Sequence, residues 1–223
     1  MSRPAPRLLL ASLALVATSC TGERTPPQEG ATGFNIPSID RPELDSVVMV
    51  GDSITEGSAE VVQQTLAAAG FAQVVVDGDA SRRIEVGTGA GGGPVSGLRT
   101  IFALMGEGAD PDVWVIELGT NDVGQLATAE EYGALIDQVL ALLPADAAVV
   151  WVNTYRPSSL DHTEMFNLVL AGRLQSRGNA VVADWFSVAS DPEQTILQSD
   201  DLHPNDNGKL ALAMLVIDAV NRL

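Results

Sequence analysis

Two patterns of hydrophobic and polar positions alternate along the chain from residue 46 onward. Short runs rich in Val and Ile, which are apolar at nearly every position, predict buried strands. Longer stretches with apolar residues three and four positions apart predict helices, and several of these have polar starts and glycine or proline stops. The predicted strands are 46–50, 73–76, 112–118, 147–152 and 179–183. The predicted helices are 56–69, 95–108, 129–143, 160–177 and 207–223.

The regular alternation of strands and helices predicts a single α/β domain over residues 46–223. Strands that are apolar on both faces need cover on both faces, so we expect a parallel sheet between two layers of helices. The predicted fold is therefore a three-layer α/β/α sandwich around a parallel sheet of the five strands. In such folds the functional groups gather at the carboxyl ends of the strands, where loops lead into helices.

Residues 1–19 have the pattern of a secretory signal peptide. Arg3 and Arg7 provide a basic start, and the apolar run over 8–17 is too short to span a bilayer as a stable helix. The residues Ala-Thr-Ser before Cys20 resemble a bacterial lipobox, in which the cysteine becomes the lipidated first residue of the mature protein. We therefore expect an exported protein of the cell envelope, held at the membrane only through a lipid on Cys20, or else a secreted one.

Residues 20–45 show neither helical nor strand periodicity, and they contain Pro26, Pro27, Pro37 and Pro42. This composition is typical of a semi-extended chain, so we expect a flexible tether between Cys20 and the domain. Cys20 is the only cysteine, which excludes an intramolecular disulfide and a cysteine-based zinc site.

The composition fits a globular core and disfavours a nucleic-acid partner. Hydrophobic residues make up 46% of the 223 positions, which is enough for one domain with a sizeable core. The chain has 12 basic and 29 acidic residues and a formal net charge of −17, which repels phosphate backbones. We expect no nucleic acid among its partners.

The residues Gly51-Asp52-Ser53 follow the first predicted strand and precede a helix. At this position the helix dipole and the free backbone N–H groups stabilise negative charge, so Ser53 is well placed as a nucleophile. Gly51 permits a tight turn. The alternative is that Ser53 serves only as an N-cap, the commonest role of a serine before a helix.

A side-chain amide follows the third predicted strand, in the sequence Gly119-Thr120-Asn121-Asp122. Asn121 lies at the same expected edge of the sheet as Ser53 and could donate a hydrogen bond to an oxyanion. The alternative is an Asx-turn that closes the strand. We expect Asp122 to brace the loop and to take no part in the chemistry.

The motif Asp200-Asp201-Leu202-His203 stands immediately before the last predicted helix. A serine hydroxyl needs a base to attack an ester at neutral pH, and the imidazole of His203 can provide it. A carboxylate three residues earlier can curl back to orient the imidazole, which assigns that role to Asp200. We expect Asp201 to face solvent.

Taken together, these three motifs resemble the first, third and fifth blocks of the SGNH (GDSL-type) hydrolase superfamily, and the resemblance covers residues 46–223. It implies a flavodoxin-like α/β/α fold without metal or cofactor. It also implies Ser53 as nucleophile, His203 as general base and then acid, and Asp200 as its orienting carboxylate. The oxyanion hole would consist of Asn121 and the backbone N–H of Ser53.

The second block of the superfamily supplies a glycine whose backbone N–H completes the oxyanion hole. The best match, Asp79-Ala80-Ser81-Arg82-Arg83, has Ser81 where related sequences often have glycine before arginine. A backbone donor survives this change, but a positive φ at that position would strain a serine. The resemblance thus implies Ser81 as an oxyanion donor, with Gly78 as the other candidate.

Other motifs have structural explanations. Gly87, Gly89 and Gly92 satisfy GxGxxG, but they do not directly follow a strand and are expected in a loop. We expect His162 to be exposed. Arg82, Arg83 and Arg156 could hold an anionic group, although solvated loop arginines are commoner. The three tryptophans are expected in the core; they are Trp114, Trp151 and Trp185.

The expected function is that of an exported serine esterase that hydrolyses carboxylic esters through an acyl-enzyme. Its substrate would be a small-molecule, glycan or lipid ester. One alternative is acyl or O-acetyl transfer to envelope sugars, where a sugar hydroxyl replaces water. Another is a lipoprotein that binds a ligand without turnover, and a third is a flavodoxin-like flavin binder.

Overall fold

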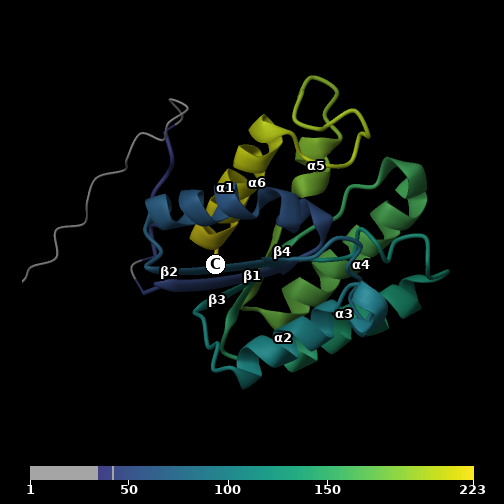
Figure 1. Cartoon of the computed structure of the whole chain (residues 1–223), viewed down its shortest axis with the longest axis horizontal. Coiled ribbons are helices and arrows are strands. Elements are labelled where there is room, and N and C mark those ends of the chain that lie inside the picture. The colour runs from purple at the N-terminus through teal and green to yellow at the C-terminus, as the bar shows by residue number, and fades with distance from the viewer. Residues whose placement is uncertain (1–34, 42) are drawn as a thin grey trace, which may run out of the picture.

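The structure, a computed structural model, describes residues 35–41 and 43–223. A five-stranded sheet in the order β2-β1-β3-β4-β5 lies at its centre (Figure 1), and every pair of neighbouring strands is parallel. The strands are β1 (Ser46–Gly51), β2 (Gln73–Gly78), β3 (Val113–Glu117), β4 (Ala148–Val152) and β5 (Ala180–Ala183). Because β1 lies between β2 and β3, its carboxyl end is flanked by the carboxyl ends of these two strands.

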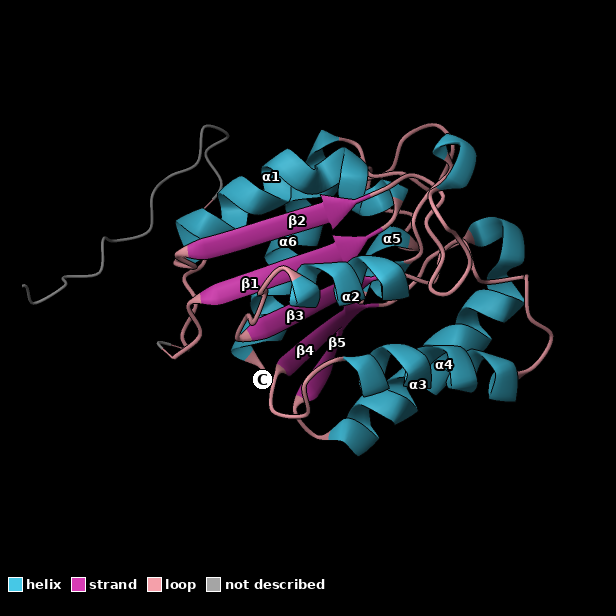
Figure 2. Cartoon of the chain, turned by 60° about the horizontal axis from the view of Figure 1, so that its bottom comes forward, coloured by secondary structure: helices cyan, strands magenta, loops and turns pink. Residues whose placement is uncertain are grey.

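Helices cover both faces of the sheet. Figure 2 shows α1 and α6 on one face and α2, α3 and α4 on the other. The helices are α1 (Ser53–Ala69), α2 (Gly97–Gly106), α3 (Ala129–Leu142), α4 (Leu160–Arg177), α5 (Trp185–Ala189) and α6 (Asp206–Asn221). Within the described ranges, no helix combines the length and the apolar character needed to cross a membrane.

Two hydrophobic cores lie on opposite faces of the sheet, because successive side chains of a strand point in opposite directions. In β3, Val113 and Val115 join the core beneath α1 and α6, whereas Trp114 and Ile116 join the core beneath α2, α3 and α4. Each core consists of buried apolar side chains, which explains why the strands are apolar at nearly every position.

These elements confirm the predicted three-layer α/β/α fold. Each of the ten predicted strands and helices is present, with ends that differ by at most three residues. The largest difference is at α1, which begins at Ser53 instead of residue 56 because Asp52 caps it. The sequence analysis did not predict α5, since five residues are too few to show a helical period.

The predicted boundary between the tether (residues 20–45) and the domain (residues 46–223) is wrong. Ile36 and Ile39 are 8% and 4% exposed and belong to the core beneath α1 and α6. The backbone N–H of Ile39 donates to the carbonyl of Ala69 at 2.8 Å. Two isolated isoleucines in a proline-rich segment form no periodic pattern that could have predicted their burial. Because both bury apolar surface against the core, Ile36 already belongs to the folded domain. The predicted signal peptide and Cys20 lie outside the described residues.

We expect Ile39→Ala to lower the free energy of unfolding by about 2–4 kcal/mol, because it leaves a cavity in the core. Urea unfolding followed by circular dichroism measures the change. The control is Leu168→Ala on α4, where the side chain is 77% exposed, and we expect a change within about 0.5 kcal/mol. Equal effects of the two substitutions would show that the segment around Ile39 is not part of the folded domain.

Candidate active site

The nucleophile candidate stands at the junction of β1 and α1. Asp52 is the N-cap of α1, and its Oδ1 accepts a hydrogen bond from the backbone N–H of Ile54 at 3.0 Å. Ser53 is therefore the first residue of the helix, and the alternative that Ser53 itself is the cap is wrong. Since the first N–H groups of a helix have no acceptor within it, the N–H of Ser53 points out of the helix start.

Ser53, His203 and Asp200 form a continuous chain of hydrogen bonds. His203 Nε2 lies 3.0 Å from Ser53 Oγ, and His203 Nδ1 lies 2.6 Å from Asp200 Oδ2. Ser53 begins α1, whereas His203 stands three residues before α6, so the fold brings together residues that are 150 positions apart. This geometry matches that of a nucleophile, a base and an orienting carboxylate.

The turn before α6 fixes Asp200 in place. Its Oδ1 accepts from the backbone N–H groups of Leu202 at 3.1 Å and His203 at 3.0 Å, which leaves Oδ2 for the imidazole. The hydrogen bond to the His203 side chain is the main reason that the pKa of Asp200 falls to about 2. Asp201 is exposed with a φ of +56°, so Asp200 is the residue that contacts the imidazole, as predicted.

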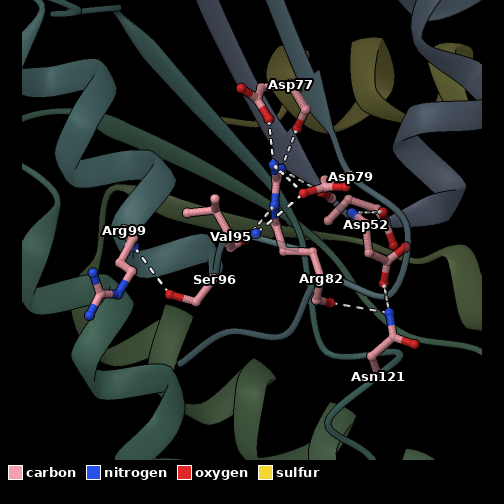
Figure 3. Close-up of polar contacts among 10 residues, drawn as sticks. Asp52, Asp77, Asp79, Arg82, Val95, Ser96, Arg99 and Asn121 are labelled. Atoms are coloured by element: carbon pink, nitrogen blue, oxygen red, sulfur yellow. Dashed lines mark hydrogen bonds and ion pairs between the residues drawn. The ribbon is translucent and has the colours of Figure 1, made fainter. Parts of the chain in front are cut away.

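Asn121 contacts Asp52, the residue before Ser53, and both of its N–H donors already have protein acceptors. Its Nδ2 donates to Asp52 Oδ2 and to the carbonyl of Arg82, each at 3.1 Å, as Figure 3 shows. A side-chain amide has only two N–H donors. An oxyanion would therefore have to replace one of these two acceptors, and the predicted role of Asn121 stays a prediction.

Ser81 adopts the backbone conformation that glycine would favour. Its φ is +62°, in a turn that the backbone N–H of Arg82 closes by donating to the carbonyl of Asp79 at 3.1 Å. This conformation costs a non-glycine residue roughly 1–2 kcal/mol. Gly78, the other candidate donor, lies within β2 opposite Gly51. Ser81 is thus the candidate that lies on the loop, and its role as a donor stays a prediction.

Arg82 is buried beneath this loop, and the expectation of a solvated loop arginine is wrong for it. Its side chain is 4% exposed and donates to the carbonyls of Gly51 at 2.8 Å, Asp77 at 3.0 Å and Val95 at 3.0 Å. Its Nη2 also lies 2.7 Å from Asp77 Oδ1 (Figure 3). Arg82 thus ties the ends of β1 and β2 to the loop around Val95 and is not available for an anionic ligand.

The two other loop arginines also have protein partners. Arg83 Nε pairs with Asp122 Oδ1 at 3.1 Å, and Asp122 Oδ2 accepts from the backbone N–H of Ile84 at 3.0 Å. Burial raises the pKa of Asp122, and the prediction that Asp122 braces the loop is confirmed. Arg156 donates to the carbonyl of Thr120 at 2.7 Å.

His162, expected to be exposed, is half-buried with its Nδ1 3.2 Å from Tyr132 Oη.

A pair of buried carboxyl groups lies next to Ser53, and the sequence analysis missed one of them. Asp52 and Glu117 are 0% and 3% exposed. Glu117 Oε2 accepts from the backbone N–H of Asp52 at 3.2 Å and from Thr55 Oγ1 at 2.9 Å. Burial raises the pKa of Asp52 to about 6. Burial and then the charge of Asp52 raise the pKa of Glu117 well above its ordinary value.

The arrangement suits acyl transfer through a serine nucleophile. It combines a hydroxyl, a base in contact with it, a carboxylate in contact with the base, and N–H groups at a helix start. Among the side chains that the structure describes, no three His, Cys, Asp or Glu residues come together in a way that could hold a metal ion.

We expect Arg82→Lys to lower the free energy of unfolding by about 2–3 kcal/mol, because an ammonium group cannot reach three carbonyls in different directions. Urea unfolding measures the change. Arg99→Lys is the matched control, since Arg99 is exposed on α2; we expect an effect below about 0.5 kcal/mol. If Arg82→Lys were as mild as the control, Arg82 would not be what holds the strand ends together.

Solved structures share this fold at low sequence identity. A lipase/acylhydrolase from Enterococcus faecalis is 19% identical with a TM-score of 0.64, and the match covers 80% of this chain and 96% of that one. The esterase EstA from Pseudoalteromonas, inhibited by monoethylphosphonate, is 18% identical with a TM-score of 0.57, covering 80% and 97%. The catalytic domain of Streptococcus pneumoniae peptidoglycan O-acetyltransferase A is 19% identical with a TM-score of 0.55, covering 79% and 90%. At these identities the likeness shows the fold alone.

The family comparison goes further than the fold. No curated protein sequence matches this chain at a significant level. The model of the GDSL-like lipase/acylhydrolase family matches residues 49–211, which include Ser53, Asn121 and His203. This match spans most of the chain and agrees with the three motifs. The chain belongs to the GDSL-like lipase/acylhydrolase family.

Proposed function

We propose that the protein is a serine esterase that hydrolyses carboxylic esters through an acyl-enzyme. The observation that carries this proposal is the hydrogen-bond chain from Ser53 Oγ through His203 to Asp200, with distances of 3.0 and 2.6 Å. Membership of an acylhydrolase family supports it.

In the proposed mechanism Ser53 Oγ attacks the ester carbonyl while His203 Nε2 takes the hydroxyl proton. The tetrahedral intermediate collapses, and His203 gives the proton to the departing alcohol, which leaves an acyl group on Ser53. Water then attacks the acyl carbonyl while His203 takes one of its protons. The bond from the acyl group to Ser53 Oγ breaks, the free acid leaves, and His203 gives that proton to Ser53 Oγ. Asp200, accepting from Nδ1, keeps Nε2 free to accept and stabilises the imidazolium.

The oxyanion would be bound by the backbone N–H groups of Ser53 and Ser81 and by the amide of Asn121. Of the two acceptors that hold this amide, the Arg82 carbonyl is neutral and the Asp52 carboxylate carries charge. A charged acceptor binds an N–H more strongly than a neutral one. The N–H that bonds to Arg82 is therefore the one that would turn to the oxyanion, while Asp52 keeps hold of the other.

A second candidate function is transfer of an acyl group to a sugar hydroxyl. His203 and Asp200 are 33% and 47% exposed, which leaves room for a bulky acceptor beside the base. The O-acetyltransferase domain with the same fold agrees with this candidate. Incubation of the protein with an acyl donor and candidate glycans separates the two functions, since a transferase forms acylated sugar where an esterase releases free acid.

The proposed site of action is the cell envelope, with residues 1–19 as a signal peptide and a lipid on Cys20 as the anchor. The basic start, the apolar run and the small residues before Cys20 support this proposal.

We expect Ser53→Ala to lower ester hydrolysis by at least about 10³-fold and to leave the fold intact. The substrates are p-nitrophenyl acetate, butyrate and a long-chain ester, which also give the preferred chain length. Ser176→Ala, on the exposed face of α4, is the control and should keep the activity of the unmodified protein. Full activity of Ser53→Ala would exclude Ser53 as the nucleophile.

Asp200 and Asp201 offer a matched pair of substitutions. We expect Asp200→Asn to lower kcat by at least about 10²-fold, since an amide in place of the carboxylate no longer stabilises the imidazolium. Asp201→Asn should change kcat little, because Asp201 is exposed and asparagine tolerates its φ of +56°. The reverse order of effects would move the orienting role to Asp201.

A further inference from the structure

Asp52 and Glu117 are two buried carboxyl groups that lack an ion-pair partner among the residues that the structure describes. The guanidinium of the buried Arg82 bonds to the carbonyl of Gly51, next to Asp52 in the sequence, and pairs with Asp77. Burying one unpaired carboxylate is costly, and burying two side by side costs much more. At most one of the two groups can therefore be ionised in the folded protein.

Gly51 makes room for this pair. A Cβ at Gly51 would lie 1.9 Å from Thr55 Oγ1 and 2.8 Å from Glu117 Oε2. The end of β1 therefore has to be a glycine if Glu117 and Thr55 are to meet beneath Ser53. This close approach explains Gly51 better than the tight turn expected from the sequence.

The hydrogen bonds and the nearby charges together assign the negative charge to Asp52. Asp52 accepts from the N–H of Ile54 and from Asn121 Nδ2, and both bonds favour its carboxylate. A positive charge on His203, from the loop before α6, also lowers the pKa of Asp52. Glu117 also accepts two hydrogen bonds, from the backbone N–H of Asp52 and from Thr55 Oγ1, but burial and the charge of Asp52 outweigh them and favour its protonated form. Above about pH 6 the pair thus holds an ionised Asp52 and a protonated Glu117.

We propose that Glu117 is a positioning residue of this site, which holds the one proton of the pair and so keeps Asp52 as the charged acceptor for the Asn121 amide. The inference rests on the proposed function, because positioning Asn121 matters only if an oxyanion forms at Ser53. Glu117 itself does not touch the reacting atoms. It acts through Asp52, which anchors one N–H of Asn121, while the other N–H would exchange the neutral carbonyl of Arg82 for the oxyanion.

Infrared spectroscopy tests the proton directly. Near pH 7.5 ordinary carboxyl groups are ionised, so we expect the carbonyl stretch of a protonated carboxylic acid in the unmodified protein and its loss in Glu117→Gln. Glu107→Gln, which replaces an exposed glutamate at the end of α2, should keep the band. Identical spectra of the unmodified protein and Glu117→Gln would overturn the proposal.

The pH dependence of unfolding gives a second readout, and its sign follows from the raised pKa of Glu117. Above its ordinary value of 4.5 the unfolded chain releases this proton while the folded chain keeps it, so the folded state loses stability as the pH rises. Glu117→Gln lacks this loss. We expect its folding equilibrium constant, relative to that of the unmodified protein, to rise by up to about tenfold per pH unit once the pH exceeds 4.5, the ordinary value for glutamate. A constant ratio would overturn the proposal.

Kinetics test the positioning role. Glu117→Ala removes the hydrogen bonds to Asp52 and Thr55, and we expect kcat to fall by about 10-fold to 100-fold. Glu117→Gln keeps a neutral group of the same shape, and we expect it to restore kcat to within about threefold of the unmodified protein. Equal losses in both variants, or none in either, would overturn the positioning role.

The two proposals can fail separately. If the unmodified protein hydrolyses no ester, the proposed function fails, whereas the infrared and unfolding experiments still decide whether Glu117 holds the proton. If hydrolysis depends on Ser53 but the infrared band is absent, the esterase proposal stands and the inference about Glu117 fails.

Discussion

The carboxylate of Asp52 is the contact on which the geometry around Ser53 depends. One oxygen accepts from the N–H of Ile54 and so begins α1 at Ser53, and the other accepts from Asn121. Asp52 thereby joins the end of β1, the start of α1 and the loop after β3. Because Asp52 is fully buried, water does not compete for these bonds, and the positions of the hydroxyl and the amide are coupled.

The burial of Asp52 also explains how the surrounding charges are arranged. The buried Arg82 is engaged by Asp77 and by backbone carbonyls, so it braces strand ends and does not neutralise Asp52. Glu117 lies against Asp52, and no cation from the described part of the chain pairs with it. A proton on Glu117 removes the repulsion between the two buried carboxylates without bringing a lysine or arginine next to the nucleophile. A cation there would compete with His203 for the charge of Asp52.

The sequence predicted the fold and the residues around Ser53 well because both follow from simple periodic patterns. Strands buried on both faces are apolar throughout, and parallel strands bring their carboxyl ends to one edge. The motifs around Ser53 and Asn121 directly follow β1 and β3 and therefore meet at that edge. His203 comes from the long loop between α5 and α6, which brings it to the same edge.

What the sequence did not predict depends on contacts between distant residues. Ile36 and Ile39 are too few to form a pattern, and an arginine such as Arg82 is usually solvated in a loop. Glu117 did leave a signal, since it is an acidic residue in the otherwise apolar strand β3. Its partner Asp52 is 65 residues away, so the strand pattern alone could not show what stabilises the acid.

The three carboxyl groups around the serine and histidine differ in role because their environments differ. Asp200 is half-exposed and holds the imidazole, which lowers its pKa to about 2 and keeps it ionised at neutral pH. Asp52 is buried, and burial raises its pKa to about 6, which is close to neutral pH. Because Glu117 is neutral, it does not repel the charge of Asp52, and Asp52 remains ionised. His203 thus has one permanent negative charge at the surface and a second one in the interior, and both favour the imidazolium that forms when Ser53 gives up its proton.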